Sequence, residues 1–197
     1  MTKEQLRLRS LLTTALFAAI IGIMAQLIIP LPLVPITGQT LAIGLAAVIL
    51  GSKYGTFSVL LYLALGCAGV PVFAEFSAGF SVIVGPTGGY LISYIPVVWI
   101  MAKYLEKTKF TFAHALTANI IGMFITLIIG TAWLKWMADL SWTAAFLSGF
   151  APFIIGGFIK ALMAAWIGLL VRKRLISARL LFTNQLSTKA VDKRASF

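Results

Sequence analysis

The sequence is poor in negative charge, cysteine and histidine. Its 197 residues include five acidic and sixteen basic residues, one histidine and one cysteine, Cys67. A single cysteine excludes an internal disulfide and leaves no Cys/His metal spacing, so we expect Cys67 to be a small packing residue. The sequence also lacks a phosphate loop, an HExxH motif, a GxSxG motif and any cluster of acids in its apolar runs. We therefore predict that the protein is not an enzyme, does not hydrolyse ATP and needs no metal or cofactor.

The residues that are present are mostly apolar. Hydrophobic side chains make up 60% of the chain and charged ones 11%, which is far outside the composition of a soluble domain. Because a helix needs about 20 mostly apolar residues to cross the bilayer core, this length allows several spans and no separate soluble domain. We predict an all-α integral membrane protein with a single transmembrane domain over residues 1–197.

Six spans can be drawn along the chain. The second and third are short, and a polar stretch bounded by Gly51 and Gly55 predicts a tight turn between them. The spans cover residues 11–29, 39–51, 54–68, 86–103, 113–133 and 144–171, and a basic tail follows at 175–197.

Basic residues gather on one side of these spans. Only Lys135 lies in a connection on the other side, and positive charge marks cytoplasmic loops. We therefore predict cytoplasmic termini, and we interpret the net charge of +11 as a topology signal rather than a sign of nucleic-acid binding. The basic residues on the cytoplasmic side are Lys3, Arg7, Arg9, Lys53, Lys103, Lys107, Lys109 and the cluster at 172–194.

Two connections on the opposite side are too apolar for solvated loops. Residues 66–85 hold one charge, Glu75, among many aliphatic and aromatic side chains, and residues 30–38 are similar. Irregular backbone at a membrane surface must be buried in protein or line a cavity, and long irregular connections are often lids or binding loops. We expect both connections to pack over a binding site.

Lys160 is the strongest functional signal. An ammonium group within a span costs a few kcal/mol, so it should face a cavity or a partner. Pro152 and the pair Gly156 and Gly157 predict that the continuous helix begins near Gly157, with Lys160 in its first turn, where the helix dipole repels a cation. The chain offers few acceptors, chiefly Glu75. Snorkelling to the interface is the alternative, and we favour contact with a ligand carboxylate or urea-type carbonyl.

Other patterns leave two interpretations open. The glycines of segment 85–90 permit close approach of a ligand to the backbone, or only tight helix packing. Ala15 and Ala19 form a small-xxx-small pair, which suits either a partner helix or internal packing. Aromatic side chains could wall an apolar pocket, although each alone is more often a core or interface residue; they are Phe73, Phe76, Tyr90, Trp133 and Trp142.

Five segments together resemble one protein family. They are 35–40 (PITGQT), 69–74 (GVPVFA), 85–91 (GPTGGYL), 130–134 (GTAWL) and 152–160 (PFIIGGFIK). These segments are similar to those of BioY, the biotin-specific substrate-binding component (S component) of energy-coupling factor (ECF) transporters. The similarity runs from the first span to the sixth, whereas the first ten residues and the tail after Arg174 show none.

The resemblance implies a fold, a substrate and partners. It implies the six-helix S-component fold in a bacterial plasma membrane, with biotin held near the extracellular side. It also implies that Ala15 and Ala19 dock on a membrane-embedded coupling subunit driven by paired ATPases. The residues that we predict to bind substrate are Gln39, Phe73, Glu75, Gly79, Thr87, Gly88, Gly89, Tyr90, Trp133, Gly157 and Lys160.

The sequence departs from the family pattern at two places. Family members commonly carry a Pro-Gly-Asp segment one turn before the lysine, but here Ile155 and Gly157 stand at the proline and aspartate positions. Glycines that commonly follow the segment 69–74 are replaced by Glu75 and Phe76. We hypothesise that Glu75 supplies the missing carboxylate, as acceptor for the ureido N–H groups and as partner of Lys160.

Other functions remain open at this point. The chain could be a stand-alone, oligomeric biotin carrier, a small channel, or an S component for a biotin precursor or another vitamin. A self-sufficient carrier usually shows internal repeats, and we find none that is convincing. A structural membrane subunit would need neither Lys160 nor the glycine-rich outer loops.

Overall fold

The computed structural model of the chain describes residues 3–178, with side chains from Leu8 onward. The tail predicted at 175–197 lies mostly outside this range, as do the side chains of Lys3 and Arg7. The elements in order are α1 (Lys3–Ala25), β1 (Ile28–Ile29), β2 (Ile36–Thr37), α2 (Gln39–Cys67), η1 (Ala74–Phe76), α3 (Phe80–Ile83), α4 (Gly88–Lys107), α5 (Phe112–Met137), α6 (Trp142–Gly149) and α7 (Ala151–Ser177).

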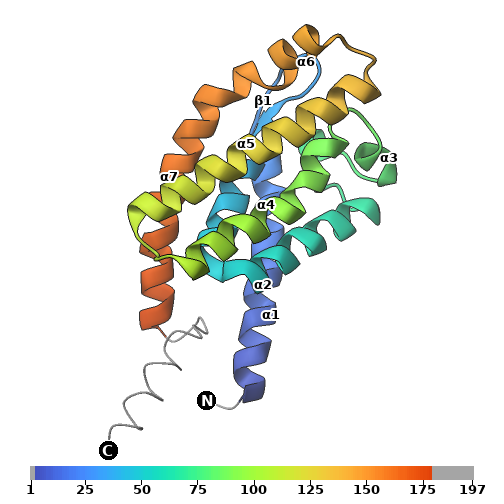
Figure 1. Cartoon of the computed structure of the whole chain (residues 1–197). Helices are drawn as coiled ribbons and strands as arrows, with labels where there is room; N and C mark the ends of the chain where they lie inside the picture. Colours follow the sequence, from blue (N-terminus) through green and yellow to red (C-terminus); the bar gives the residue numbers. More distant parts are fainter. Residues whose placement is uncertain (1–2, 179–197) are drawn as a thin grey trace, which may run out of the picture.

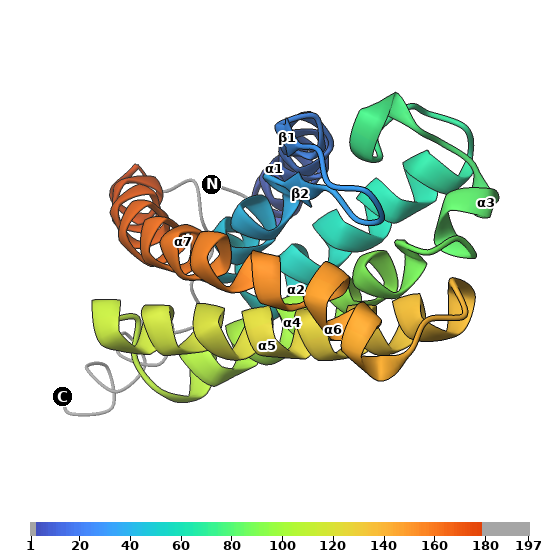
Figure 2. The ribbon, with the colours of Figure 1, turned by 90° about the horizontal axis from the view of Figure 1, so that it is seen from above.

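The long helices form one bundle around α2. Helix α2 packs against α1, α4 and α7, and α5 packs against α4 and α7 (Figure 1). Figure 2 shows α5 and α7 side by side on one face, with α1 on the other side of α2. Helix α1 begins and α7 ends at the same end of the bundle, while the β1–β2 hairpin and α6 lie at the opposite end (Figure 1).

Within the described residues, four helical segments are long and apolar enough to cross a membrane. Many of their large apolar side chains point outward, among them Leu12, Ile128 and Ile155, as expected for helices that contact lipid rather than water. The segments are Leu8–Ala25, Gln39–Cys67, Phe112–Met137 and Trp142–Ser177. The chain is therefore a multi-pass membrane protein, in agreement with its composition.

The predicted end of the first span and the predicted start of the continuous last helix were wrong. Helix α1 stops at Ala25, before the predicted residue 29, because the chain turns there into the antiparallel hairpin of β1 and β2. Helix α7 starts at Ala151 with Pro152 in its first turn, where the missing N–H costs no hydrogen bond. It continues through both glycines, so Lys160 lies beyond its second turn and not in its first.

Helix α2 is broken at a single residue. Gly51 has φ 77° and ψ −174°, a conformation that glycine adopts without steric strain, and the helix resumes at Ser52. The predicted turn from Gly51 to Gly55 is therefore too long. Each half of α2 is shorter than the roughly 20 residues of a typical span. Cys67, at the end of the second half, is half-buried against the core, as expected.

Two charged side chains from other helices form hydrogen bonds with the backbone on either side of the break. Nη1 of Arg172 in α7 donates hydrogen bonds to the carbonyl oxygens of Val48 (3.1 Å) and Ile49 (2.7 Å). The carboxylate of Glu106 in α4 accepts from the backbone N–H (2.7 Å) and hydroxyl (2.9 Å) of Ser52. A helix C-terminus attracts a cation and an N-terminus an anion. Arg172 and Glu106 thus satisfy backbone groups that the break leaves unpaired.

We predict that Arg172→Met lowers stability and leaves the ligand site intact. Two buried carbonyls lose a charged donor, which should cost about 2–3 kcal/mol, or roughly 5–10 °C in unfolding temperature for a chain of this size. Thermal denaturation of the purified protein in detergent measures the effect. Lys173→Met is the matched control because Lys173 is the exposed neighbour on the same helix. Equal unfolding temperatures for the two variants would contradict this role.

Candidate ligand-binding site

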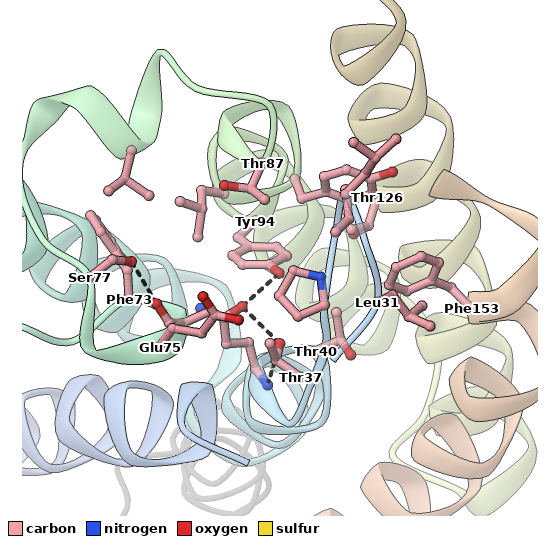
Figure 3. Close-up of a pocket in the computed structure, with 18 of the residues that line it drawn as sticks. Leu31, Thr37, Thr40, Phe73, Glu75, Ser77, Thr87, Tyr94, Thr126 and Phe153 are labelled. Carbon is pink, nitrogen blue, oxygen red and sulfur yellow. Dashed lines mark hydrogen bonds between the residues drawn. The ribbon is translucent and has the colours of Figure 1, made fainter. Parts of the chain in front are cut away.

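A cavity of about 260 Å³ opens at the end of the bundle opposite the start of α1 and the end of α7. It lies between the first loop (residues 26–38), the second loop (residues 68–87) and helices α2, α4, α5 and α7. In Figure 3, Phe73, Glu75 and Ser77 approach it from one side, and Thr126 and Phe153 from the other. Small-molecule sites typically begin near 300 Å³, so this cavity suits a small ligand.

The cavity brings together more than half of the predicted binding residues. They come from the second loop and from three different helices, as the two apolar loops led us to expect. The predicted residues on its wall are Gln39, Phe73, Glu75, Thr87, Tyr90 and Lys160.

The remaining predicted binding residues lie off this wall. Gly88 and Gly89 are buried and leave no room for a Cβ atom, against the backbone of Ile83 and the side chain of Trp133 respectively. The Trp133 indole N–H donates to the carbonyl of Gly85 (2.9 Å), so this tryptophan anchors the second loop. The glycine segment therefore serves tight packing, one of the two interpretations left open.

Gly79 and Gly157, which were also predicted to bind substrate, do not line the main cavity for separate reasons. Gly79 has φ 96° and precedes α3, where its N–H donates to the carbonyl of Gly66 (2.7 Å). Gly157 borders a smaller cavity beneath the main one. Phe76 and Trp142, considered as pocket walls, are exposed and do not line either cavity.

Gln39 organises the cavity floor, and both its amide oxygen and its amide nitrogen are engaged within the protein. Its Oε1 accepts hydrogen bonds from the hydroxyls of Thr37 (2.9 Å) and Tyr94 (3.3 Å), and its Nε2 donates to the hydroxyl of Tyr62. Its side chain is thus fixed from three directions. We infer that Gln39 positions its neighbours around the ligand.

Lys160 points into the protein and not toward the interface. Its ammonium donates to the carbonyl of Thr37 (3.1 Å), which leaves two N–H donors for a ligand. Snorkelling is therefore not its role in this structure. Glu75 lies on the same wall, but the ion pair found among the described residues joins Lys103 and Glu106 instead. The proposed Glu75–Lys160 partnership remains a prediction.

Gln26, the residue that follows α1, holds the second loop over the cavity. Gln26 Nε2 donates to the carbonyl of Phe73 (2.9 Å), and its Oε1 accepts from the N–H of Phe76 (2.9 Å). Between them the loop is strained, because Glu75 and Phe76 have φ values of 59° and 53°, which non-glycine residues rarely adopt. The hydrogen bonds of Gln26 thus stabilise an unfavourable loop conformation.

We predict that Gln26→Ala loosens this loop. Two hydrogen bonds of about 1 kcal/mol each are lost, so the loop should open roughly 30-fold more often, and chymotrypsin should cut after the exposed Phe76 about 30-fold faster. The rate at which the two fragments appear measures this opening. Leu27→Ala, at the exposed neighbouring position, is the control; the same rate in both variants would show that Gln26 does not restrain the loop.

The outer face of α1 is uncovered. Ala15 and Ala19 are exposed, whereas Phe17, Ala18 and Ile21 of the same helix are buried against the bundle. Internal packing, the second interpretation of the small-residue pair, is therefore not found. The exposed pair leaves a smooth helix face that a partner helix can approach closely.

Sequence reasoning missed several residues of the cavity floor, including two threonines. Thr40, in the first turn of α2, and Thr126, in the middle of α5, line the main cavity and the smaller one beneath it. Thr40 belongs to the segment 35–40 that carried the family resemblance. Thr126 is a polar residue within an apolar span, which was the available signal.

Comparison with known proteins gives consistent matches over most of the chain. A model of the BioY family matches residues 1–177. Biotin transporter BioY2 of Lactococcus lactis subsp. cremoris is 39% identical over 181 residues, covering 92% of this chain and 100% of the relative. Biotin transporter BioY of Thermotoga maritima is 39% identical over 167 residues, covering 84% and 97%.

A solved structure has the same fold. The crystal structure of the S-component for biotin from an ECF-type ABC transporter matches with a TM-score of 0.81 and 31% identity, covering 88% of this chain and 95% of that one. The S-component fold expected from the sequence is therefore confirmed.

Proposed function

Because the chain belongs to the BioY family, we propose that it takes up biotin as the S component of an ECF-type transporter. The observation that carries this function is the similarity to two biotin transporters over nearly their whole length. The cavity agrees with it, since it is small, closed by two apolar loops and provided with one cationic donor, Lys160. The chain is a transporter component and not an enzyme.

We further propose six crossings with both termini in the cytoplasm of a bacterial cell. Counting the halves of α2 separately, the chain has α1, two halves of α2, α4, α5 and α7 as bundle helices. Helix α1 begins and α7 ends at one end of the bundle, and the basic residues Lys173 and Arg174 lie in the last turns of α7 there (Figure 1). This distribution supports a cytoplasmic assignment for that end. Biotin would then enter from the outside.

The exposed pair Ala15 and Ala19 is our candidate contact with a membrane-embedded coupling subunit. Among the described residues we find no phosphate-binding loop or metal-binding cluster, so energy for transport would come from ATPase subunits bound to that partner. Alternatively, the chain would transport biotin as a homo-oligomer without these partner subunits.

An uptake experiment tests this function. A bacterial strain that can neither make nor import biotin should grow on nanomolar biotin when it expresses this chain with the coupling subunits of its source. Growth that requires the same biotin concentration as the empty vector, with the protein present in the membrane, would contradict biotin uptake.

Glu75→Gln tests the hypothesis that Glu75 accepts the ureido N–H groups. A hydrogen bond to a charged acceptor contributes about 1.5–3 kcal/mol, so we predict that biotin affinity falls at least tenfold, measured by calorimetry on the purified protein. Ser77→Ala, on the same wall of the cavity, is the control. Unchanged affinity in the glutamine variant would remove Glu75 from the site and leave the function itself standing.

A further inference from the structure

A second, smaller compartment of about 50 Å³ lies directly beneath the biotin cavity. It is enclosed by α2, α4, α5 and α7 and is lined mainly by apolar side chains, with no carboxylate on its wall. The two compartments share six residues and therefore adjoin. The shared residues are Thr40, Tyr94, Thr126, Leu127, Phe153 and Lys160.

Two of the shared residues have hydroxyls that are not used by the protein. Thr40 Oγ1 is buried and makes no hydrogen bond within the part of the chain that the structure describes. Thr126 is 4% exposed, and its hydroxyl likewise has no hydrogen bond to any described residue. Buried polar groups in folded proteins are nearly always paired, and an unpaired one calls for an explanation.

The neighbouring polar side chains are already paired. Gln39 is held by Thr37, Tyr62 and Tyr94, as described above. Tyr90 donates its hydroxyl hydrogen to the carbonyl of Gly149 (2.7 Å). Among the polar side chains that the two compartments share, Tyr94 donates to Gln39, whereas Thr40, Thr126 and Lys160 keep a hydroxyl or N–H donors for a ligand.

We propose that Thr40 and Thr126 contact the substrate directly and, with Lys160, select for a cyclic urea. A urea ring presents one carbonyl acceptor and two N–H donors. A hydroxyl both donates and accepts, whereas an ammonium only donates. The ammonium of Lys160 can donate to the ring carbonyl, and the two threonine oxygens can accept from the ring N–H groups. A carboxylate, which only accepts, would leave both threonine oxygens without a donor.

The apolar surroundings strengthen this selection. Ile43, Val97 and Leu127 make much of the compartment wall apolar, and hydrogen bonds in such a low-dielectric site are stronger than in water. A ligand that lacks the urea N–H groups would leave buried hydroxyls unpaired and so bind more weakly. This inference rests on the proposed function and names the residues that recognise the ring end of biotin. It is the alternative to the Glu75 hypothesis, since the two assign the same ureido N–H groups to different acceptors, and the titration of Glu75→Gln distinguishes them.

The test compares Thr40→Val and Thr126→Val with wild type, using titration calorimetry with biotin and with 2-iminobiotin, whose ring has a guanidine in place of the urea. Each valine variant should bind biotin about 5- to 30-fold more weakly, and its affinity for 2-iminobiotin should fall to a similar extent, because that ligand keeps both ring N–H groups. Thr126→Ser, which keeps the hydroxyl, should stay within about twofold of wild type. Thr117→Val is the control, because Thr117 is exposed on α5 and bonds to its own helix.

Thermal denaturation separates ligand contact from a role in folding. Removing a buried, unpaired hydroxyl should leave the unfolding temperature of the unliganded protein unchanged or higher. Either valine variant that binds biotin within twofold of wild type overturns the assignment of that threonine. If wild type itself fails to bind biotin, the proposed function has failed and not this inference alone.

Discussion

Lys160→Met should weaken biotin binding by about 10- to 100-fold without loss of stability. The ammonium makes one hydrogen bond inside the protein, to the carbonyl of Thr37, and has two donors directed at the cavity. A hydrogen bond from a charged donor to a ligand contributes about 1.5–3 kcal/mol. This free energy corresponds to the 10- to 100-fold loss of biotin affinity. Methionine matches the length of the lysine stem, so packing in α7 is kept.

Stability distinguishes this role from a structural one. Among the described residues, no carboxylate pairs with Lys160, so its removal relieves a desolvation cost instead of breaking an ion pair. The unfolding temperature without ligand should therefore be equal to or above that of wild type. Lys173→Met, at an exposed position of the same helix, should change neither the biotin affinity nor the unfolding temperature. A large loss of stability together with unchanged affinity would show that Lys160 is structural.

Bulky substitutions at Ala15 and Ala19 should abolish uptake and spare binding. Both alanines are exposed on α1, and tryptophans there would prevent the close helix approach that a small-residue face permits. We expect uptake by cells that express Ala15→Trp with Ala19→Trp to fall by at least about tenfold. Biotin affinity of the purified variant should stay within twofold of wild type, since neither residue lines the cavity.

The control for this face is Ile128→Trp. Ile128 is exposed on α5, away from α1, and should also contact lipid. Its tryptophan variant should keep wild-type uptake, which separates loss of docking from general disturbance of insertion. Uptake by the double variant at the wild-type rate would place the coupling contact elsewhere. Loss of affinity in that variant would instead indicate that α1 supports the binding site.

The sequence predicts the helical bundle and the end at which its cavity lies. Long apolar runs identify the helices, and the two apolar loops identify the end at which the cavity lies. Lys160 could be singled out because a charged side chain within a span is energetically costly and is therefore a candidate for a functional role. Each of these predictions depends on a local property of the chain.

Features that depend on distant partners could not be predicted. The break at Gly51 is one residue long because Arg172 and Glu106, far away in sequence, pair its exposed backbone groups. Gly156 and Gly157 remain helical because α7 is packed against α2 and α5, which overrides their low helix propensity. Whether a polar residue is free or engaged also depends on tertiary contacts.

The most direct test of the account is binding of labelled biotin to the purified protein in detergent. Desthiobiotin, thiamine and riboflavin serve as competitors. The account predicts saturable binding of biotin that desthiobiotin, which keeps the urea ring, displaces and the other two vitamins do not. A protein that is demonstrably folded yet binds no biotin, or that thiamine or riboflavin displaces equally well, would contradict it.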